Sequence, residues 1–124
     1  MGANDIQLTS TELELMMILW KIEKGSVKEI MLQLPAERDL AYTSVSTIIR
    51  ILEKKGIVAA TKQGRGHIYH PMVNRAEYEK SSVNLLVDNV FRGAPLSIVK
   101  YLIEEEKLSE SDLNELQNLL KGRK

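Results

Sequence analysis

The chain contains no cysteine among its 124 residues. This absence excludes disulfide bonds, thiol redox chemistry and metal sites built on thiolate ligands. The chain also lacks any apolar run close to the roughly 18–20 residues that a membrane-spanning helix requires. Its start, MGANDIQLTS, shows neither basic residues nor a following apolar stretch, so we expect no secretory signal. Together these absences favour a protein of the cytoplasm.

Net charge is also missing, because 17 basic residues balance 17 acidic ones. The net charge of the chain therefore gives no indication of a polyanionic partner. The charges are clustered, however: residues 41–71 carry five basic side chains against one acidic residue, Glu53, which gives a local charge of +4. A local basic patch is enough for a compact protein to gain from counterion release on binding nucleic acid. The basic residues of this stretch are Arg50, Lys54, Lys55, Lys62 and Arg65.

Catalytic and metal-binding patterns are weak. His67 and His70 are the only histidines, and a spacing of three residues along a strand points them to opposite faces. We therefore expect no metal ion shared by this pair. No glycine-rich phosphate loop follows a predicted strand, and no nucleophile, base and orienting group suggest themselves. The sequence predicts no enzyme, no cofactor and no metal site.

Local signals predict the first two helices. Thr9 with Glu12, and Ser26 with Glu29, form the pattern of a capping box at a helix start. Gly25 is expected to end the first of these helices as a left-handed cap. The first helix also carries apolar residues at helical spacing that we expect in the core, and these are Leu13, Met16, Met17 and Trp20.

The stretch 40–71 carries the most informative pattern of the chain. It predicts a short helix from about Thr43 that Gly56 closes, followed by two strand-like runs joined at Gly64-Arg65-Gly66. This is the layout of a winged helix-turn-helix, in which one helix enters the DNA major groove and a hairpin lies beside it. We therefore predict an α+β fold, mostly α, with a winged helix-turn-helix DNA-binding domain over residues 5–73.

One face of this short helix is typical of nucleic-acid binding. Its residues recur at intervals that place them on one side, and they are Thr43, Ser46, Thr47, Arg50 and Lys54. The other side carries Val45, Ile48, Ile49 and Leu52. Short hydroxyl side chains let a helix backbone approach DNA closely, whereas an ordinary amphipathic surface helix, which is the alternative, usually carries long Glu and Lys. Arg65 at the hairpin tip is expected to contact a phosphate or the minor groove.

Residues 74–124 predict three further helical segments. They carry more apolar side chains than three slim helices can bury by themselves. A second copy of the chain is the simplest cover, and dimeric DNA-binding proteins match two-fold symmetric sites. We therefore predict a C-terminal three-helix dimerisation domain over residues 74–124. The apolar residues expected at its interface are Leu86, Val90, Ile98, Val99, Leu102, Leu116 and Leu120.

Three runs in this order, LTSTELELMMILW, AYTSVSTIIRILEKKGIV and IYHP after a glycine-rich turn, resemble the penicillinase-repressor family of the BlaI/MecI/CopY type. The resemblance covers nearly the whole chain. It implies a dimeric repressor whose third helix binds a palindromic promoter site. In the best-known branch it also implies a membrane sensor protease that cleaves the C-terminal domain and releases the DNA. By position, the family's DNA contacts fall on Thr43, Ser44, Ser46, Thr47 and Arg65.

The chain departs from the family pattern at several positions. The staphylococcal members have basic residues where this chain has Thr43 and Ser46, and relatives more often have the arginine one place after Arg50. The candidate regulatory cleavage site falls at Tyr101 and Leu102, where the lactam-sensing members have Asn-Phe. The copper-responsive branch binds metal through a cysteine-rich tail, so the lack of cysteine excludes copper sensing by that route.

These observations predict a DNA-binding transcriptional regulator that acts as a repressor and inserts into no membrane. Its expected partners are double-stranded DNA and a second copy of the chain, with a membrane sensor protease as a further candidate. The alternative is a winged-helix module whose basic face binds an acidic protein. Short hydroxyl residues favour DNA, whereas the neutral net charge favours a protein partner. The predicted DNA-binding residues are Thr43, Ser44, Ser46, Thr47, Arg50, Lys54 and Arg65.

Overall fold

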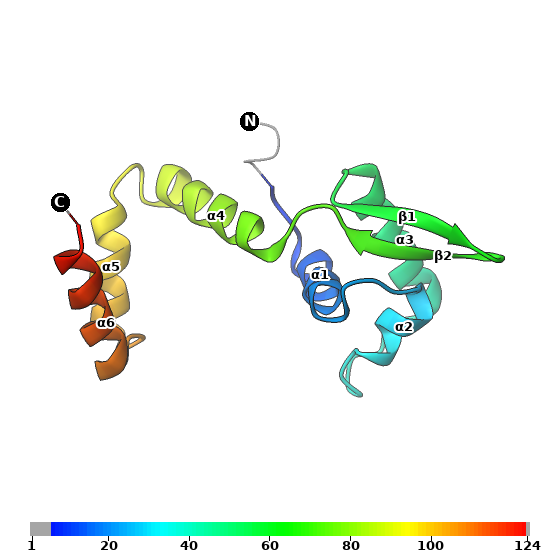
Figure 1. Cartoon of the computed structure of the whole chain (residues 1–124), viewed down its shortest axis with the longest axis horizontal. Coiled ribbons are helices and arrows are strands. Elements are labelled where there is room, and N and C mark those ends of the chain that lie inside the picture. Colours follow the sequence, from blue (N-terminus) through cyan, green and yellow to red (C-terminus); the bar gives the residue numbers. More distant parts are fainter. Residues whose placement is uncertain (1–5, 124) are drawn as a thin grey trace. The chain divides into compact units, whose positions relative to one another are not determined.

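The computed structural model describes residues 6–123 of the chain. Contacts divide these residues into two compact units, of which the first ends at Ser82 and the second begins at Val83. Figure 1 shows the elements in order. The first unit contains α1 (Ser10–Ile22), α2 (Val27–Leu32), α3 (Tyr42–Lys54), β1 (Val58–Gln63), β2 (Gly66–Pro71) and most of α4 (Arg75–Leu85). The second contains the π-helix η2 (Leu86–Val90), α5 (Pro95–Glu104) and α6 (Glu110–Lys121). The predicted α+β, mostly α, fold is confirmed.

Both predicted capping boxes form. Thr9 Oγ1 accepts a hydrogen bond from the Glu12 backbone N–H at 3.1 Å, and Glu12 Oε1 accepts one from the Thr9 N–H at 2.9 Å. Ser26 and Glu29 make the same reciprocal pair at 3.2 and 2.8 Å. Each box satisfies two backbone donors that a helix start leaves without a partner, so these short patterns determine where α1 and α2 begin.

Gly25 does not have the role that the sequence predicts for it. Helix α1 ends at Ile22, and Glu23 instead has the positive φ, 76°, at the end of the helix. Gly25 pairs with Tyr69 through two backbone hydrogen bonds of 2.8 and 2.9 Å, which adds a bridge beside β2. A Cβ atom at Gly25 would lie 2.9 Å from Ile22 Cδ1 and 3.3 Å from Glu29 Cβ, so a larger residue here would require these side chains to shift. The prediction for Gly56 is confirmed, because it follows α3 with φ of 80°.

The core of the first unit corrects the predicted face of α1. The helix buries Leu15, Met16 and Leu19 completely, whereas Met17 is 40% exposed and Trp20 is partly buried. Apolar residues occupy every position from Leu15 to Trp20, so their spacing alone did not identify the buried side. The buried side is the one that meets the apolar residues of α2, α3 and the hairpin, which are Ile30, Val45, Ile49, Leu52, Val58 and Tyr69.

Strands β1 and β2 form the predicted antiparallel hairpin. The register pairs Val58 with Pro71 at one end and Gln63 with Gly66 at the other, and leaves Gly64 and Arg65 in the turn. Val58 and Tyr69 lie on the face that packs against the helices. Because side chains alternate along a strand, His67 and His70 lie on opposite faces, as expected. Among residues 6–123, no three His, Cys, Asp or Glu side chains gather in a cluster that could hold a metal ion.

The start of α4 packs on the rest of the first unit. The indole N–H of Trp20 donates to the backbone carbonyl of Val73 at 2.8 Å, and the Trp20 ring lies 5.7 Å from that of Tyr78. The backbone N–H of Ile6 donates to the buried hydroxyl of Ser81 at 2.9 Å. These contacts carry the compact unit past the predicted boundary between residues 73 and 74, as far as Ser82. The functional division at residues 73 and 74 stays a prediction.

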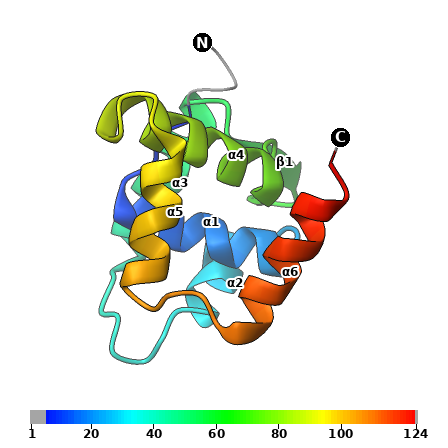
Figure 2. The same cartoon turned by 90° about the vertical axis from the view of Figure 1, so that its left-hand side faces the viewer.

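The second unit has little interior of its own. None of the residues of η2, α5 or α6 is buried, although Phe91 and Tyr101 bring their rings to 6.0 Å. Figure 2 shows α5 and α6 diverging from the loop that joins them. The first of the three predicted C-terminal helical segments is not α-helical throughout, because α4 changes to the π-helix η2 after Leu85. No helix in the described part of the chain is long and apolar enough to cross a membrane.

Candidate nucleic-acid interface

Helix α3 has one buried face and one polar, exposed face. Val45, Ile49 and Leu52 are fully buried and hold the helix on the core of the first unit. The opposite face exposes Thr43, Ser44, Thr47, Arg50 and Lys54, while Ser46 at its edge is partly buried. Every predicted contact residue of α3 is therefore at least partly accessible, and the packing of the buried face fixes the direction in which this set points.

The N-terminal end of α3 has no side-chain cap. Its N-cap residue, Ala41, makes no side-chain hydrogen bond, as at the start of α5, whereas α1 and α6 each start with a capping box. The first backbone N–H groups of α3 thus receive no cap from a side chain, and such groups favour phosphate oxygens. Tyr42, the first residue of the helix, is half exposed beside them. Sequence reasoning missed both features, although the absence of a capping residue at position 41 was a readable signal.

The basic residues around α3 fall into two kinds. Among residues 6–123, Arg50, Lys54, Lys62 and Arg65 form no ion pair, so their charges are free to meet a phosphate backbone. Lys55 is different, because its Nζ lies 3.0 Å from both carboxylate oxygens of Glu12 on α1. The sequence count included Lys55 in the basic surface. The structure corrects it to four unpaired cations in this region.

Glu12 is the one nearly buried acidic side chain near α3 among the described residues. Burial by itself raises the pKa of the Glu12 carboxyl. Hydrogen bonds from the Thr9 backbone N–H and the Lys55 ammonium group, with the positive charge of Lys55, together outweigh burial, so the pKa lies below its ordinary value of 4.5. The carboxylate therefore stays charged near neutral pH and holds Lys55 in place.

The hairpin places Arg65 apart from the core. Arg65 is exposed in the turn between β1 and β2, and the preceding Gly64 has a φ of 60°, which glycine adopts without strain. Figure 1 shows this turn at the projecting end of the two strands. Lys62 lies near the end of β1 on the same arm and is also exposed. The arrangement presents two cations on a hairpin beside α3, which suits contact with sugar-phosphate backbone.

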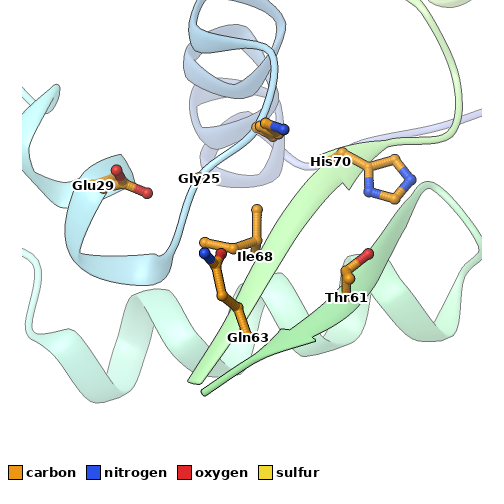
Figure 3. Close-up of a pocket in the computed structure, with 7 residues that line it drawn as sticks. Gly25, Glu29, Thr61, Gln63, Ile68 and His70 are labelled. Atoms are coloured by element: carbon orange, nitrogen blue, oxygen red, sulfur yellow. The ribbon is translucent and has the colours of Figure 1, made fainter. Parts of the chain in front are cut away.

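A separate cavity of about 610 Å³ lies in the first unit (Figure 3). It is found between the hairpin and the segment that carries Gly25 and Glu29, on the sheet face opposite the core. The Glu29 carboxylate is already engaged in the cap at Ser26. None of the predicted DNA-binding residues lines this cavity, whose lining residues are Lys24, Gly25, Glu29, Thr61, Gln63, Ile68 and His70.

The residues predicted at the dimer interface are all at least partly accessible in the single chain. Four of them are exposed, and they are Leu86, Val90, Leu102 and Leu120. Three are partly buried, and they are Ile98, Val99 and Leu116. The candidate cleavage positions, Tyr101 and Leu102, lie within α5 and are both exposed.

The chain is similar to known proteins over most of its length. The family model described as "Penicillinase repressor" matches residues 8–122. The methicillin resistance regulatory protein MecI of Mammaliicoccus sciuri is 27% identical over 114 residues, which cover 92% of this chain and 93% of that protein. The penicillinase repressor of Bacillus licheniformis is 26% identical over 118 residues, 95% of this chain and 92% of the relative. The solution structure of the monomeric Bacillus licheniformis BlaI in complex with the blaP half-operator matches with a TM-score of 0.51 at 27% identity, and covers 60% of this chain and 90% of that one.

Proposed function

The chain belongs to the penicillinase repressor family and is a DNA-binding transcriptional repressor, and from this premise we propose that two copies bind a palindromic operator through α3 and the β1–β2 hairpin. The observation that carries the proposal is the exposed hydroxyl-and-basic face of α3, set on a fully buried apolar face. The alternative, a module that binds an acidic protein, is not favoured, because the family is one of repressors.

In this proposal α3 is the helix that enters the major groove. Thr43, Ser44, Ser46 and Thr47 supply short hydroxyl groups that can donate to or accept from base edges and phosphates. Arg50 follows Thr47 on the same face and offers a planar, bidentate donor to a guanine or a phosphate. The uncapped N–H groups at the start of α3 support an approach of this end to the DNA backbone.

Lys54 and Arg65 are proposed to contact phosphates on either side of the groove. Lys54 lies at the C-terminal end of α3, and Arg65 lies at the hairpin turn, so they extend the basic surface in two directions. Their unpaired charges support this role, because counterion release then contributes to affinity without a competing ion pair. Such contacts position the protein and do not by themselves specify sequence.

The second unit is proposed to form the dimer. The absence of any buried residue in η2, α5 and α6 supports this role, since these helices carry large exposed apolar side chains such as Val90 and Leu120. Covering one Leu or Val side chain contributes roughly 1.5–3 kcal/mol, so a handful at a two-fold interface is enough to hold two chains together. A dimer then gains affinity for a two-site operator through effective concentration.

We also propose that a membrane sensor protease cleaves the peptide bond between Tyr101 and Leu102 and so releases the repressor from its operator. This bond lies inside α5, and a protease needs an extended segment, so cleavage requires local unfolding of α5. The absence of buried residues in α5 is consistent with such an opening. The relatives are bacterial, and a bacterial operator lies in the cytoplasm, where we therefore propose that this repressor acts.

Sedimentation and duplex binding of the full chain and of a chain cut after Ser82 test the proposal. The cut chain keeps the Trp20–Val73 and Ile6–Ser81 hydrogen bonds, so its first unit should stay folded. We expect a full-length dimer at micromolar concentration that binds duplex from its own upstream region with steep salt dependence, and a monomeric cut chain that binds much more weakly. A full-length monomer contradicts the dimer, and a full chain that binds no duplex contradicts the DNA-binding role.

A further inference from the structure

Two consecutive lysines end α3, and the structure gives them different surroundings. Lys54 is the last residue of the helix, lies on the side of Thr47 and Arg50, and forms no ion pair with any described residue. Lys55 is the C-cap residue, and its ammonium group lies 3.0 Å from both oxygens of the Glu12 carboxylate on α1. The side chain of Glu12 is only 6% exposed. Both lysines are exposed to solvent, but Lys54 is unpaired, whereas Lys55, whose side chain is 41% exposed, is held by an ion pair to a nearly buried carboxylate.

The position of the Glu12 carboxylate is fixed independently of Lys55. Glu12 Oε1 accepts the Thr9 backbone N–H at 2.9 Å, and the Glu12 backbone N–H donates to Thr9 Oγ1 at 3.1 Å. The carboxylate thus belongs to the first turn of α1. The C-terminal end of α3 is attached to that turn through Lys55, across 43 residues of sequence.

A second ion pair attaches the segment before α3 to the same helix. The guanidinium group of Arg38 contacts the Glu14 carboxylate through Nε and Nη2 at 2.9–3.1 Å. This pair is partly exposed, and solvent weakens it. The Glu12–Lys55 pair is more sheltered, and moving Lys55 towards a phosphate would leave a nearly buried carboxylate without its partner, which is unfavourable.

We propose that Glu12 and Lys55 are positioning residues that hold the C-terminal end of α3, so that Thr47 and Arg50 reach base edges, while Lys55 itself contacts no DNA. The proposal rests on the proposed DNA-binding function. Base contacts depend on placement to within about 0.5 Å, whereas phosphate contacts by flexible side chains tolerate displacement. Loss of the pair therefore lowers the preference for the operator over other duplexes and leaves general affinity for DNA unchanged.

The test compares Lys54→Ala with Lys55→Ala in the full chain, with a duplex that wild-type protein selects from a random pool and with an unrelated duplex. Lys54→Ala should weaken binding to both duplexes and lower the slope of log affinity against log salt by about 0.9 for each bound copy, which is about 1.8 for a dimer that carries Lys54 in both chains. Lys55→Ala should keep the salt slope and the affinity for the unrelated duplex. Its preference for the selected duplex should fall about tenfold, the scale of one lost base contact.

Two further variants separate positioning from loss of the fold. Glu12→Gln keeps an oxygen for the Thr9 N–H and removes the charge, so it should fold and reproduce the lowered preference of Lys55→Ala. Lys55→Arg keeps the ion pair and should retain the wild-type preference. A salt slope that falls in Lys55→Ala as in Lys54→Ala overturns the proposal, and so does wild-type preference in both Lys55→Ala and Glu12→Gln. A wild-type protein that prefers no duplex contradicts recognition of an operator by α3, and the proposal falls with it.

Discussion

Two isoleucines on α3 provide a matched pair for testing which face of this helix is presented. Ile49 is completely buried, and Ile51, two residues later on the same helix, is 41% exposed. Replacing Ile49 with Ala removes buried methylene and methyl groups and leaves a cavity, which lowers the free energy of unfolding by about 2–5 kcal/mol. Ile51→Ala should lower it by less than about 1 kcal/mol, because much of this side chain is already in water and Ala is the better helix former.

Urea unfolding followed by the fluorescence of Trp20 measures this difference. Trp20 is the only tryptophan, and its indole N–H binds the Val73 carbonyl within the first unit, so its signal reports on that unit. With a slope of about 1.5 kcal/mol/M, a loss of 3 kcal/mol moves the midpoint down by about 2 M. All variants are compared at equal protein concentration, because association stabilises the folded chain. Equal midpoint shifts for the two variants would refute the assignment of the faces, and with it the exposed position of Thr47 and Arg50.

Three further predictions concern the surface and its anchoring. Thr47→Ala and Arg50→Ala should each weaken binding to the selected duplex by roughly 1–3 kcal/mol in an anisotropy titration, without a change in the urea midpoint; unchanged affinity for both would remove α3 from the interface. Arg65→Ala should weaken binding to selected and unrelated duplexes by similar amounts and lower the salt slope by about one unit for each bound copy, about two for the dimer; a loss confined to the selected duplex would make Arg65 a base-reading residue. Because the pKa of Glu12 is lowered in the folded chain, its charged form stabilises the fold above the ordinary value of 4.5, and this stability is lost as the pH falls through the lowered value. Glu12→Gln should flatten this part of the acid dependence in urea unfolding, and parallel curves for the two proteins would contradict it.

Features that depend on neighbours in sequence were predictable. The capping boxes at Thr9–Glu12 and Ser26–Glu29 join residues three apart, and the hairpin follows from a glycine turn between two strand-like runs. The faces of α3 were predictable because hydroxyl, basic and apolar residues there occupy separate sides of the helix.

Features that depend on distant contacts were not predictable. The prediction of the buried side of α1 was wrong because α1 itself carries apolar residues on every side. Only its packing on α2, α3 and the hairpin determines that Leu15 and Leu19 are buried. The role of Gly25 depends on Tyr69, and the engagement of Lys55 depends on Glu12, both far away in sequence. A count of charges along the chain cannot distinguish Lys54, which is unpaired, from Lys55, which is paired with Glu12.

Selection of bound sequences from a random duplex pool by the full chain tests the central claim most directly. A dimer that places one α3 in each of two major grooves predicts enrichment of an inverted repeat, with half-site centres about one helical turn, roughly 10 bp, or a multiple of it apart. The chain cut after Ser82 should enrich a single half-site weakly or not at all. Enrichment of one asymmetric site by the full chain would contradict the dimeric reading, and no enrichment of any sequence would contradict recognition of an operator by α3.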